Sequence, residues 1–135
     1  MKSLLRLIAL LGAGLLAAVA LTASFTQAQA ADEDDPCRQP GVVINGTAAN
    51  EVFVGKPGVD LIRGGGGNDV LFGLGGEDIL IGGAGNDVLH GGPCDDDLRG
   101  ANGGDTLDGG LGVDDGNGGN GVDSCLANVE NPVSC

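Results

Sequence analysis

The chain is poor in the residues that most enzyme sites need. Its 135 residues include no tryptophan, no tyrosine and a single histidine, His90. A Ser-His-Asp triad cannot be built convincingly around this histidine, which we expect to face solvent from a strand. The lack of Trp and Tyr argues against a sugar-binding cleft, and the glycine patterns lack the strand–helix unit of a nucleotide-binding loop. We therefore expect no enzymatic activity.

Positive charge is equally scarce. The sequence carries 6 Lys and Arg residues against 19 Asp and Glu residues, which gives a formal net charge of −13. Nucleic acids and anionic membrane surfaces attract basic proteins and repel acidic ones. The charge therefore excludes both as partners.

The N-terminal residues 1–30 have the features of a secretory signal peptide. Lys2 and Arg6 precede an apolar run over 7–21, and Ala28-Gln29-Ala30 provides small residues for cleavage after Ala30. The alternative is an uncleaved membrane anchor, since 7–25 is nearly long enough to span a bilayer. Cleavage is favoured by Gly12 and Gly14, so we expect a secreted, extracellular protein.

Residues 31–45 form an acidic leader followed by an entry strand. The acids of 32–35 are typical of a solvated tail. The apolar residues of 42–44 lie directly before the repeats, and Ile44 is in phase with the inward positions that follow. We expect this strand to cover the first coil, because the ends of a repeat array need capping.

Residues 46–126 divide into nine consecutive blocks of nine. Every block begins with glycine, its sixth residue is an acid, and its eighth residue is apolar in the first seven blocks. The sixth-position acids are Glu51, Asp60, Asp69, Asp78, Asp87, Asp96, Asp105, Asp114 and Asp123. The apolar eighth-position residues are Phe53, Ile62, Leu71, Leu80, Leu89, Leu98 and Leu107.

The block 82–90, Gly-Gly-Ala-Gly-Asn-Asp-Val-Leu-His, resembles the nonapeptide of the RTX, or haemolysin-type, calcium-binding repeats, and 64–72 matches as fully. The resemblance implies an all-β fold, a right-handed parallel β-solenoid (β-roll) with two blocks per coil. Residues eighteen apart would then lie about 4.8 Å from each other. We expect each block to form a glycine turn and a very short strand, with position eight inward and positions seven and nine outward.

Stacking of the coils would place acid over acid, beginning with Asp60 over Asp78 and Asp69 over Asp87. Carboxylates this close repel strongly, so we expect that only a bound dication holds them there. Ca²⁺ accepts six to eight oxygen ligands in loose geometry and suits such turns better than Mg²⁺. Glu51 is the poorest candidate. The predicted ligands of several Ca²⁺ ions are the carboxylates of Asp60, Asp69, Asp78, Asp87, Asp96, Asp105, Asp114 and Asp123 and the carbonyls of Gly58, Gly65, Gly67, Gly76, Gly83, Gly85 and Gly103.

The repeats cannot hold themselves together through their core alone. One inward side chain per block supplies about 1.5 to 3 kcal/mol, against about 1 to 2 kcal/mol of backbone entropy for each residue. The acids outnumber Lys56, Arg63 and Arg99, and the many glycines are flexible when unfolded. We therefore expect calcium binding and folding to be one cooperative event.

Four cysteines in an exported chain indicate two disulfides, for which three pairings exist. We favour Cys125 with Cys135, which would pin Val129 and Val133 over the last coil within a C-terminal cap, 127–135. Cys37 would then pair with Cys94.

The last blocks are less regular than the first. Gly116 leaves one inward position without a side chain, so we expect stability to fall towards the C-terminal end.

Several outward positions of the early blocks are apolar. They are Val52, Val54, Val70, Phe72, Ile79, Ile81 and Val88. β-propensity and cover by the N-terminal segment account for them in the simplest way. The alternative is a face for weak cell-surface binding or self-association. The second function class is therefore an extracellular adhesion or cell-envelope scaffold that calcium rigidifies.

Overall fold

The computed structural model describes residues 35–126, 128–129 and 131–135. The predicted signal peptide and the leader residues 31–34 lie outside this part. The described elements are η1 (Pro36–Arg38), β1 (Pro40–Asn45), β2 (Val52–Val54), β3 (Val59–Gly66), β4 (Val70–Phe72), β5 (Ile79–Ala84), β6 (Val88–Pro93), β7 (Asp97–Asn102), β8 (Thr106–Leu111), β9 (Asp115–Asn120), β10 (Ser124–Cys125) and β11 (Asn131–Val133). None of the helices among these residues is long and apolar enough to cross a membrane.

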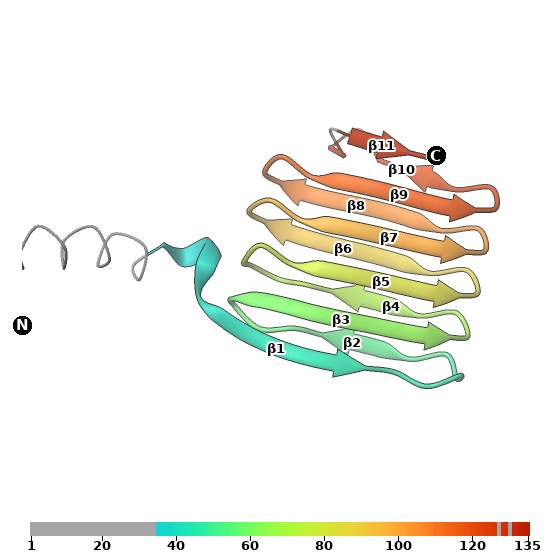
Figure 1. Ribbon diagram of the computed structural model, residues 1–135, viewed down its shortest axis with the longest axis horizontal. Helices are drawn as coiled ribbons and strands as arrows, with labels where there is room; N and C mark the ends of the chain where they lie inside the picture. Colours follow the sequence, from blue (N-terminus) through green and yellow to red (C-terminus); the bar gives the residue numbers. More distant parts are fainter. Residues whose placement is uncertain (1–34, 127, 130) are drawn as a thin grey trace, which may run out of the picture. The chain divides into compact units, whose positions relative to one another are not determined.

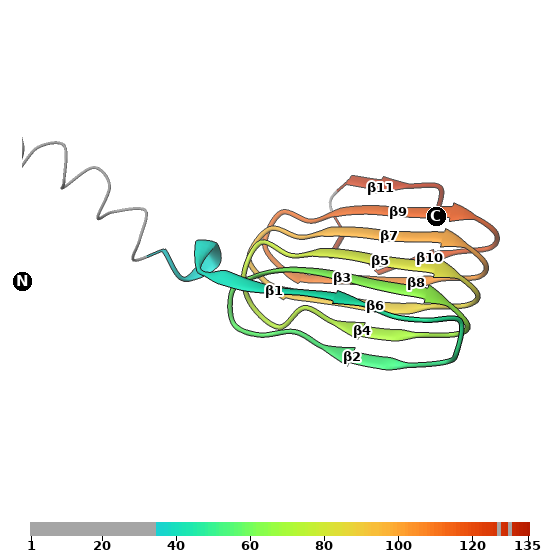
Figure 2. The same cartoon turned by 60° about the horizontal axis from the view of Figure 1, so that its bottom comes forward.

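The strands wind into a parallel β-solenoid, which confirms the predicted fold class (Figure 1). One sheet has the strand order β1-β3-β5-β7-β9-β11 and the other has the order β10-β8-β6-β4-β2. Figure 2 shows the two sheets as separate layers joined by turns at both edges. Leu71 pairs with Leu89 and Leu80 with Leu98, so two blocks form each coil, as predicted.

The strands are longer than the repeat pattern predicts. The strands β5 to β9 each have six residues, because they continue through positions one to three of the next block. Gly83 pairs with Ala101 and Gly92 with Gly110 within these extensions. Only positions four to six remain as the turn. The expectation of very short strands was wrong for most blocks, because the first three residues of the next block, glycines included, also extend and join the ladder.

The core is a single column of apolar side chains between the sheets. Fully buried are Ile62, Leu71, Leu80, Leu89, Leu98 and Leu107, all from position eight. The partly buried Ile44, Phe53 and Cys125 pack against this column. Ile44 pairs with Ile62, as its phase predicts, and extends the core into the entry strand β1.

The inward position of Gly116 is filled by a residue from outside the repeats. Val129 is only 5% exposed, and a Cβ atom built on Gly116 would lie 2.5 Å from its Cγ1 atom. Val129 therefore covers the last coil, as predicted, and the expected gap in the core was wrong. Val133, which we expected to cover the last coil, is 54% exposed and does not.

Both favoured disulfides are present. The Cα atoms of Cys37 and Cys94 are 5.7 Å apart, and those of Cys125 and Cys135 are 5.6 Å apart. Asp35 is not part of a solvated tail, because its Oδ1 atom accepts a hydrogen bond of 2.9 Å from the Cys37 N–H and caps η1.

At the C-terminal end of the solenoid, β11 pairs with β9 and lengthens the first sheet.

Candidate metal centre

The turns of the solenoid form two columns, one along each edge. We call positions four to six of the blocks beginning at Gly46, Gly64, Gly82, Gly100 and Gly118 the odd turns, which lead from the first sheet into the second. The same positions of the blocks beginning at Gly55, Gly73, Gly91 and Gly109 are the even turns, which lead back. Each turn ends with its sixth-position acid. The predicted carboxylate ligands therefore lie in two parallel columns.

The acids of both columns are buried between the coils. Exposure is between 0% and 3% for Asp60, Asp69, Asp78, Asp87, Asp96, Asp105 and Asp114. Buried carboxylates require hydrogen bonds or a counter-charge, because the loss of hydration is costly. A carboxylate oxygen that lacks a hydrogen bond therefore indicates a site that requires a counter-charge.

One oxygen of each carboxylate is satisfied by the main chain of the preceding coil. Asp60 N–H donates to Asp78 Oδ1 at 2.8 Å, and Asp96 N–H donates to Asp114 Oδ1 at 2.9 Å. The odd column repeats the bond, for example from Asp69 N–H to Asp87 Oδ1 at 2.8 Å. A main-chain donor thus lies between successive acids. The expectation that only a dication holds them in place was wrong in this respect.

The second carboxylate oxygen has a hydrogen-bond donor in the first two blocks but not in the blocks that follow. In the first two blocks it has a donor from its own block: Thr47 N–H reaches Glu51 Oε2 at 2.7 Å, and Lys56 N–H reaches Asp60 Oδ2 at 2.6 Å. Further along, buried Oδ2 atoms have no hydrogen-bond partner among the described residues at Asp69, Asp78, Asp87, Asp96 and Asp105. A cation bound beside each Oδ2 would supply the missing interaction.

The glycine that begins each block makes room for this second oxygen. A side chain at Gly64, Gly73 or Gly91 would overlap the Oδ2 atom of Asp69, Asp78 or Asp96, respectively. The acid therefore folds back over the first residue of its own block. This geometry explains why glycine occupies position one in all nine blocks.

The predicted glycine ligands all have positive φ, but only those at position four lie in the turns, since Gly65 and Gly83 lie within β3 and β5. The position-four glycines Gly58, Gly67, Gly76, Gly85 and Gly103 have φ values of 146°, 95°, 130°, 127° and 135°, and Gly65 and Gly83 at position two have 103° and 119°. Positive φ is accessible to glycine at little cost. Leu74, Cys94 and Ala101 adopt it as well, with φ of 85°, 88° and 84°. Cys94 therefore keeps the backbone of the turn at position four, and Leu74 and Ala101 keep the glycine-like φ at position two.

The donor set fits a hard cation. Among the described residues, no group of three or more His, Cys, Asp or Glu side chains converges. A metal ion at these turns would therefore need main-chain carbonyl oxygens beside the aspartates, which is the mixture that Ca²⁺ takes. The carboxylates present, with Oδ2 lacking a donor, fit that ion.

Burial makes ionisation of these acids costly. It raises the pKa of Asp78 from 3.8 to about 6 and that of Asp96 to about 7, although the main-chain hydrogen bonds from Asp60 and Asp78 act in the opposite direction. The neighbouring carboxylates raise both pKa values further. Burial raises the pKa of Asp87 and Asp105 in the odd column as well. A nearby positive charge would favour the ionised forms.

Sequence reasoning missed a second set of side chains in the odd turns. Asn68 N–H donates to Asn50 Oδ1 and Asn86 N–H donates to Asn68 Oδ1, each at 2.8 Å. We call Asn50, Asn68 and Asn86 the asparagine ladder. Their recurrence at position five of alternate blocks was the available signal.

Comparison with known families agrees with this geometry. Residues 45–80 and 72–107 match the model of the RTX calcium-binding nonapeptide repeat. This chain is an RTX-type repeat protein. No curated protein and no solved structure matches the chain. RTX repeats wound into a β-solenoid indicate a calcium-binding protein, and calcium is the ion for which the turns are suited.

Proposed function

We propose that this RTX protein is secreted, binds several Ca²⁺ ions in its odd and even turns, and folds cooperatively as it does so. The observation that carries the proposal is the set of buried Oδ2 atoms without a hydrogen-bond donor at Asp69, Asp78, Asp87, Asp96 and Asp105. Affinities of about 10⁻⁴ to 10⁻³ M are usual for extracellular calcium modules. We expect the sites to fall in that range.

The coupling to folding follows from the energetics of the coil. Each coil buries two core side chains and also two acids, whose ionised forms oppose burial. The turns exist only when successive coils are stacked, so an unfolded chain has no formed site. Calcium therefore stabilises the folded state by mass action.

Equilibrium dialysis against calcium tests the binding. We expect Asp87→Asn to bind less Ca²⁺ than the unaltered protein, because Asp87 lies in the middle of the odd column. Asp108→Asn is the matched control, since Asp108 lies on the outer face of β8 and accepts a hydrogen bond from Asn128. Equal calcium binding by Asp87→Asn and the unaltered protein would contradict the assignment.

Export through a cleaved signal over 1–30 and the absence of enzymatic activity are parts of the same proposal. Extracellular calcium is abundant enough for weak sites, and both disulfides suit an oxidising compartment. His90 stacks on Phe72 with ring centroids 5.0 Å apart, and its Nδ1 atom is 3.2 Å from Asp108 Oδ2. These contacts give the histidine a structural role on the outer face of the sheet. Mass analysis of the exported protein should show Ala31 as its first residue.

The second candidate is a calcium-rigidified adhesion or cell-envelope scaffold. It is favoured by the exposure of Val43, Val52 and Val54, which are 66%, 67% and 55% exposed in the first coils. A pull-down on cell-wall material with and without calcium separates the two functions. Calcium-dependent retention that Val52→Ser and Val54→Ser abolish would support the scaffold, and no retention would support calcium binding alone.

A further inference from the structure

The two turn columns are joined from coil to coil by different means. In the odd turns, the asparagine ladder accepts the main-chain N–H of the next position five: Asn50 from Asn68, Asn68 from Asn86, and Asn86 from Gly104 at 2.7 Å. Each bond fixes one turn against the next.

The even turns have no asparagine at position five. Their residues there are Val59, Glu77, Asp95 and Val113. The leader supplies the acceptors instead: Val59 N–H donates to Gln39 O at 2.7 Å, and Glu77 N–H donates to Cys37 O at 2.9 Å. Beyond the leader a side chain resumes the role, since Val113 N–H donates to Asp95 Oδ1 at 2.8 Å.

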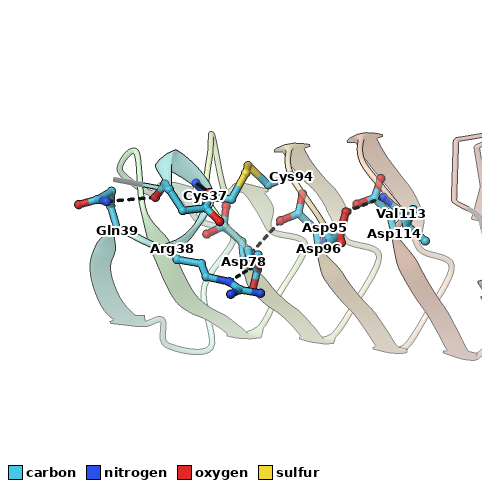
Figure 3. The surroundings of a disulfide bond; sticks show 11 residues. Cys37, Arg38, Gln39, Asp78, Cys94, Asp95, Asp96, Val113 and Asp114 are labelled. Atoms are coloured by element: carbon cyan, nitrogen blue, oxygen red, sulfur yellow. Dashed lines mark hydrogen bonds and ion pairs between the residues drawn. A yellow bond between two sulfur atoms is a disulfide. The ribbon is translucent and has the colours of Figure 1, made fainter. Parts of the chain in front are cut away.

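The leader is fixed against these turns by several contacts. Cys37 is bonded covalently to Cys94, which occupies the position-four site of an even turn with φ of 88° (Figure 3). Arg38 Nε lies 3.1 Å from Glu77 Oε1. Within the leader, Gln39 Nε2 donates to Asp35 O at 3.0 Å. Figure 3 shows the disulfide beside the stacked acids Asp78, Asp96 and Asp114. The leader thus contacts the blocks that begin at Gly55, Gly73 and Gly91.

We propose that residues 35–39, held by the Cys37–Cys94 disulfide, are a clamp that positions the even turns for calcium, as the asparagine ladder positions the odd turns. This inference rests on the proposed calcium function. The residues of the clamp act as positioning residues, because they hold the backbone that carries Asp78 and Asp96 without providing the carboxylates themselves.

The clamp should affect one column and leave the other unchanged. A site made of main-chain carbonyls depends on the orientation of the turn, and the position-five amide lies directly before the acid. Without the clamp, the Val59 and Glu77 amides lose their acceptors, while the Asn68 and Asn86 amides keep theirs. The two columns therefore offer an internal comparison within a single molecule.

Amide hydrogen exchange in saturating calcium tests the clamp. We expect the double variant Cys37→Ser, Cys94→Ser to exchange at least tenfold faster at Val59 and Glu77, with Asn68 and Asn86 unchanged. The variant Cys125→Ser, Cys135→Ser is the control, since its disulfide lies in the C-terminal cap and should leave all four amides unchanged. Unchanged exchange at Val59 and Glu77, or an equal increase in both columns, would overturn the proposal.

A complementary variant retains the disulfide. Asn86→Ala removes the acceptor of the Gly104 amide and should raise exchange there, while Val59 and Glu77 remain protected. An equal rise at Val59 and Glu77 would show that the columns are not positioned independently. This result would contradict the clamp even if the cysteine variant does not fold.

Calcium titration by calorimetry separates the clamp from the function on which it rests. We expect the cysteine double variant Cys37→Ser, Cys94→Ser to keep one class of sites at the original affinity and to lose about tenfold in the other. No calcium binding by the unaltered protein would contradict the proposed function. Calcium binding that is identical in the unaltered protein and this variant would contradict the clamp alone.

Discussion

Replacing Asp96 by asparagine should have opposite effects with and without calcium. The introduced amide would keep a side-chain oxygen to accept from Asp78 N–H, which is 2.8 Å from Asp96 Oδ1 in the unaltered protein, and would remove the buried negative charge. The pKa of Asp96 rises from 3.8 to about 7 on folding. At pH 8 that difference corresponds to about 4 kcal/mol by which ionisation opposes folding.

The net gain is smaller than this figure. An amide NH₂ group buried without an acceptor costs about 1 to 3 kcal/mol, so we expect Asp96→Asn to raise the free energy of unfolding by about 2 kcal/mol in chelator. In chelator with enough osmolyte to fold half of the unaltered protein, this gain should raise the ratio of folded to unfolded chain about 30-fold. In calcium the variant lacks one charged ligand, so its melting temperature should fall below that of the unaltered protein.

The assay at pH 8 is far-ultraviolet circular dichroism in chelator with that osmolyte, and thermal melting in millimolar calcium. Asp95→Asn is the control for net charge, because Asp95 is the exposed neighbour in the same turn and its Oδ1 atom accepts from Val113 N–H. We expect it to change stability by less than about 0.5 kcal/mol in either condition. A destabilising effect of Asp96→Asn in both conditions would refute the reasoning.

Three further predictions concern pH, the core and the first glycine of the block. In chelator, the raised pKa values of Asp78 (about 6) and Asp96 (about 7) mean that their protonated forms stabilise the fold below about pH 4, and that this contribution is lost as the pH rises through 6 to 7. Circular dichroism in chelator should therefore show strand content falling between pH 4 and 8, and strand content that rises with pH would contradict this prediction. In urea unfolding, Val129→Ala should lower the free energy of unfolding by about 2 kcal/mol because it leaves a cavity, and Gly116→Val should lower it because the two side chains would overlap. The double variant Gly116→Val, Val129→Gly should recover part of this stability, and additive losses would show that the two residues do not share one space. In a calcium titration, Gly73→Ala should weaken calcium-induced folding, because its methyl group would overlap Asp78 Oδ2. The control Gly75→Ala should be tolerated, because its Cβ atom would lie 3.9 Å from Pro93. Equal effects of the two variants would show that the acid does not fold back over the first glycine of its block.

The resemblance of the nine-residue blocks to the RTX repeats was sufficient to predict the coil. A glycine, an acid and an apolar residue at fixed positions determine which residues face inward, and the eighteen-residue register between strands follows once two blocks form a coil. The pairing of Cys37 with Cys94 and of Cys125 with Cys135 was also favoured correctly. The inward positions follow from the spacing, whereas the coil of two blocks was implied by the resemblance and the disulfide pairing was favoured among three.

Contacts between the repeats and residues outside them could not be predicted in detail from the repeat pattern. The position of Val129 over the last coil was predicted, but its packing in the space beside Gly116 was not. The backbone of Cys37 and Gln39 replaces the asparagine ladder without any side-chain signal. The direction of the bond between Asp60 N–H and Asp78 Oδ1 depends on how the acid folds back over the first glycine of its own block. Such features require coordinates, because different backbones are compatible with one spacing.

Calcium titration of the chelator-treated protein, followed by calorimetry and by circular dichroism on the same sample, tests whether binding and folding are one event. We expect β-structure to appear only as calcium binds and both signals to saturate at the same calcium concentration. A full set of strands in chelator at pH 8 that calcium leaves unchanged would contradict it.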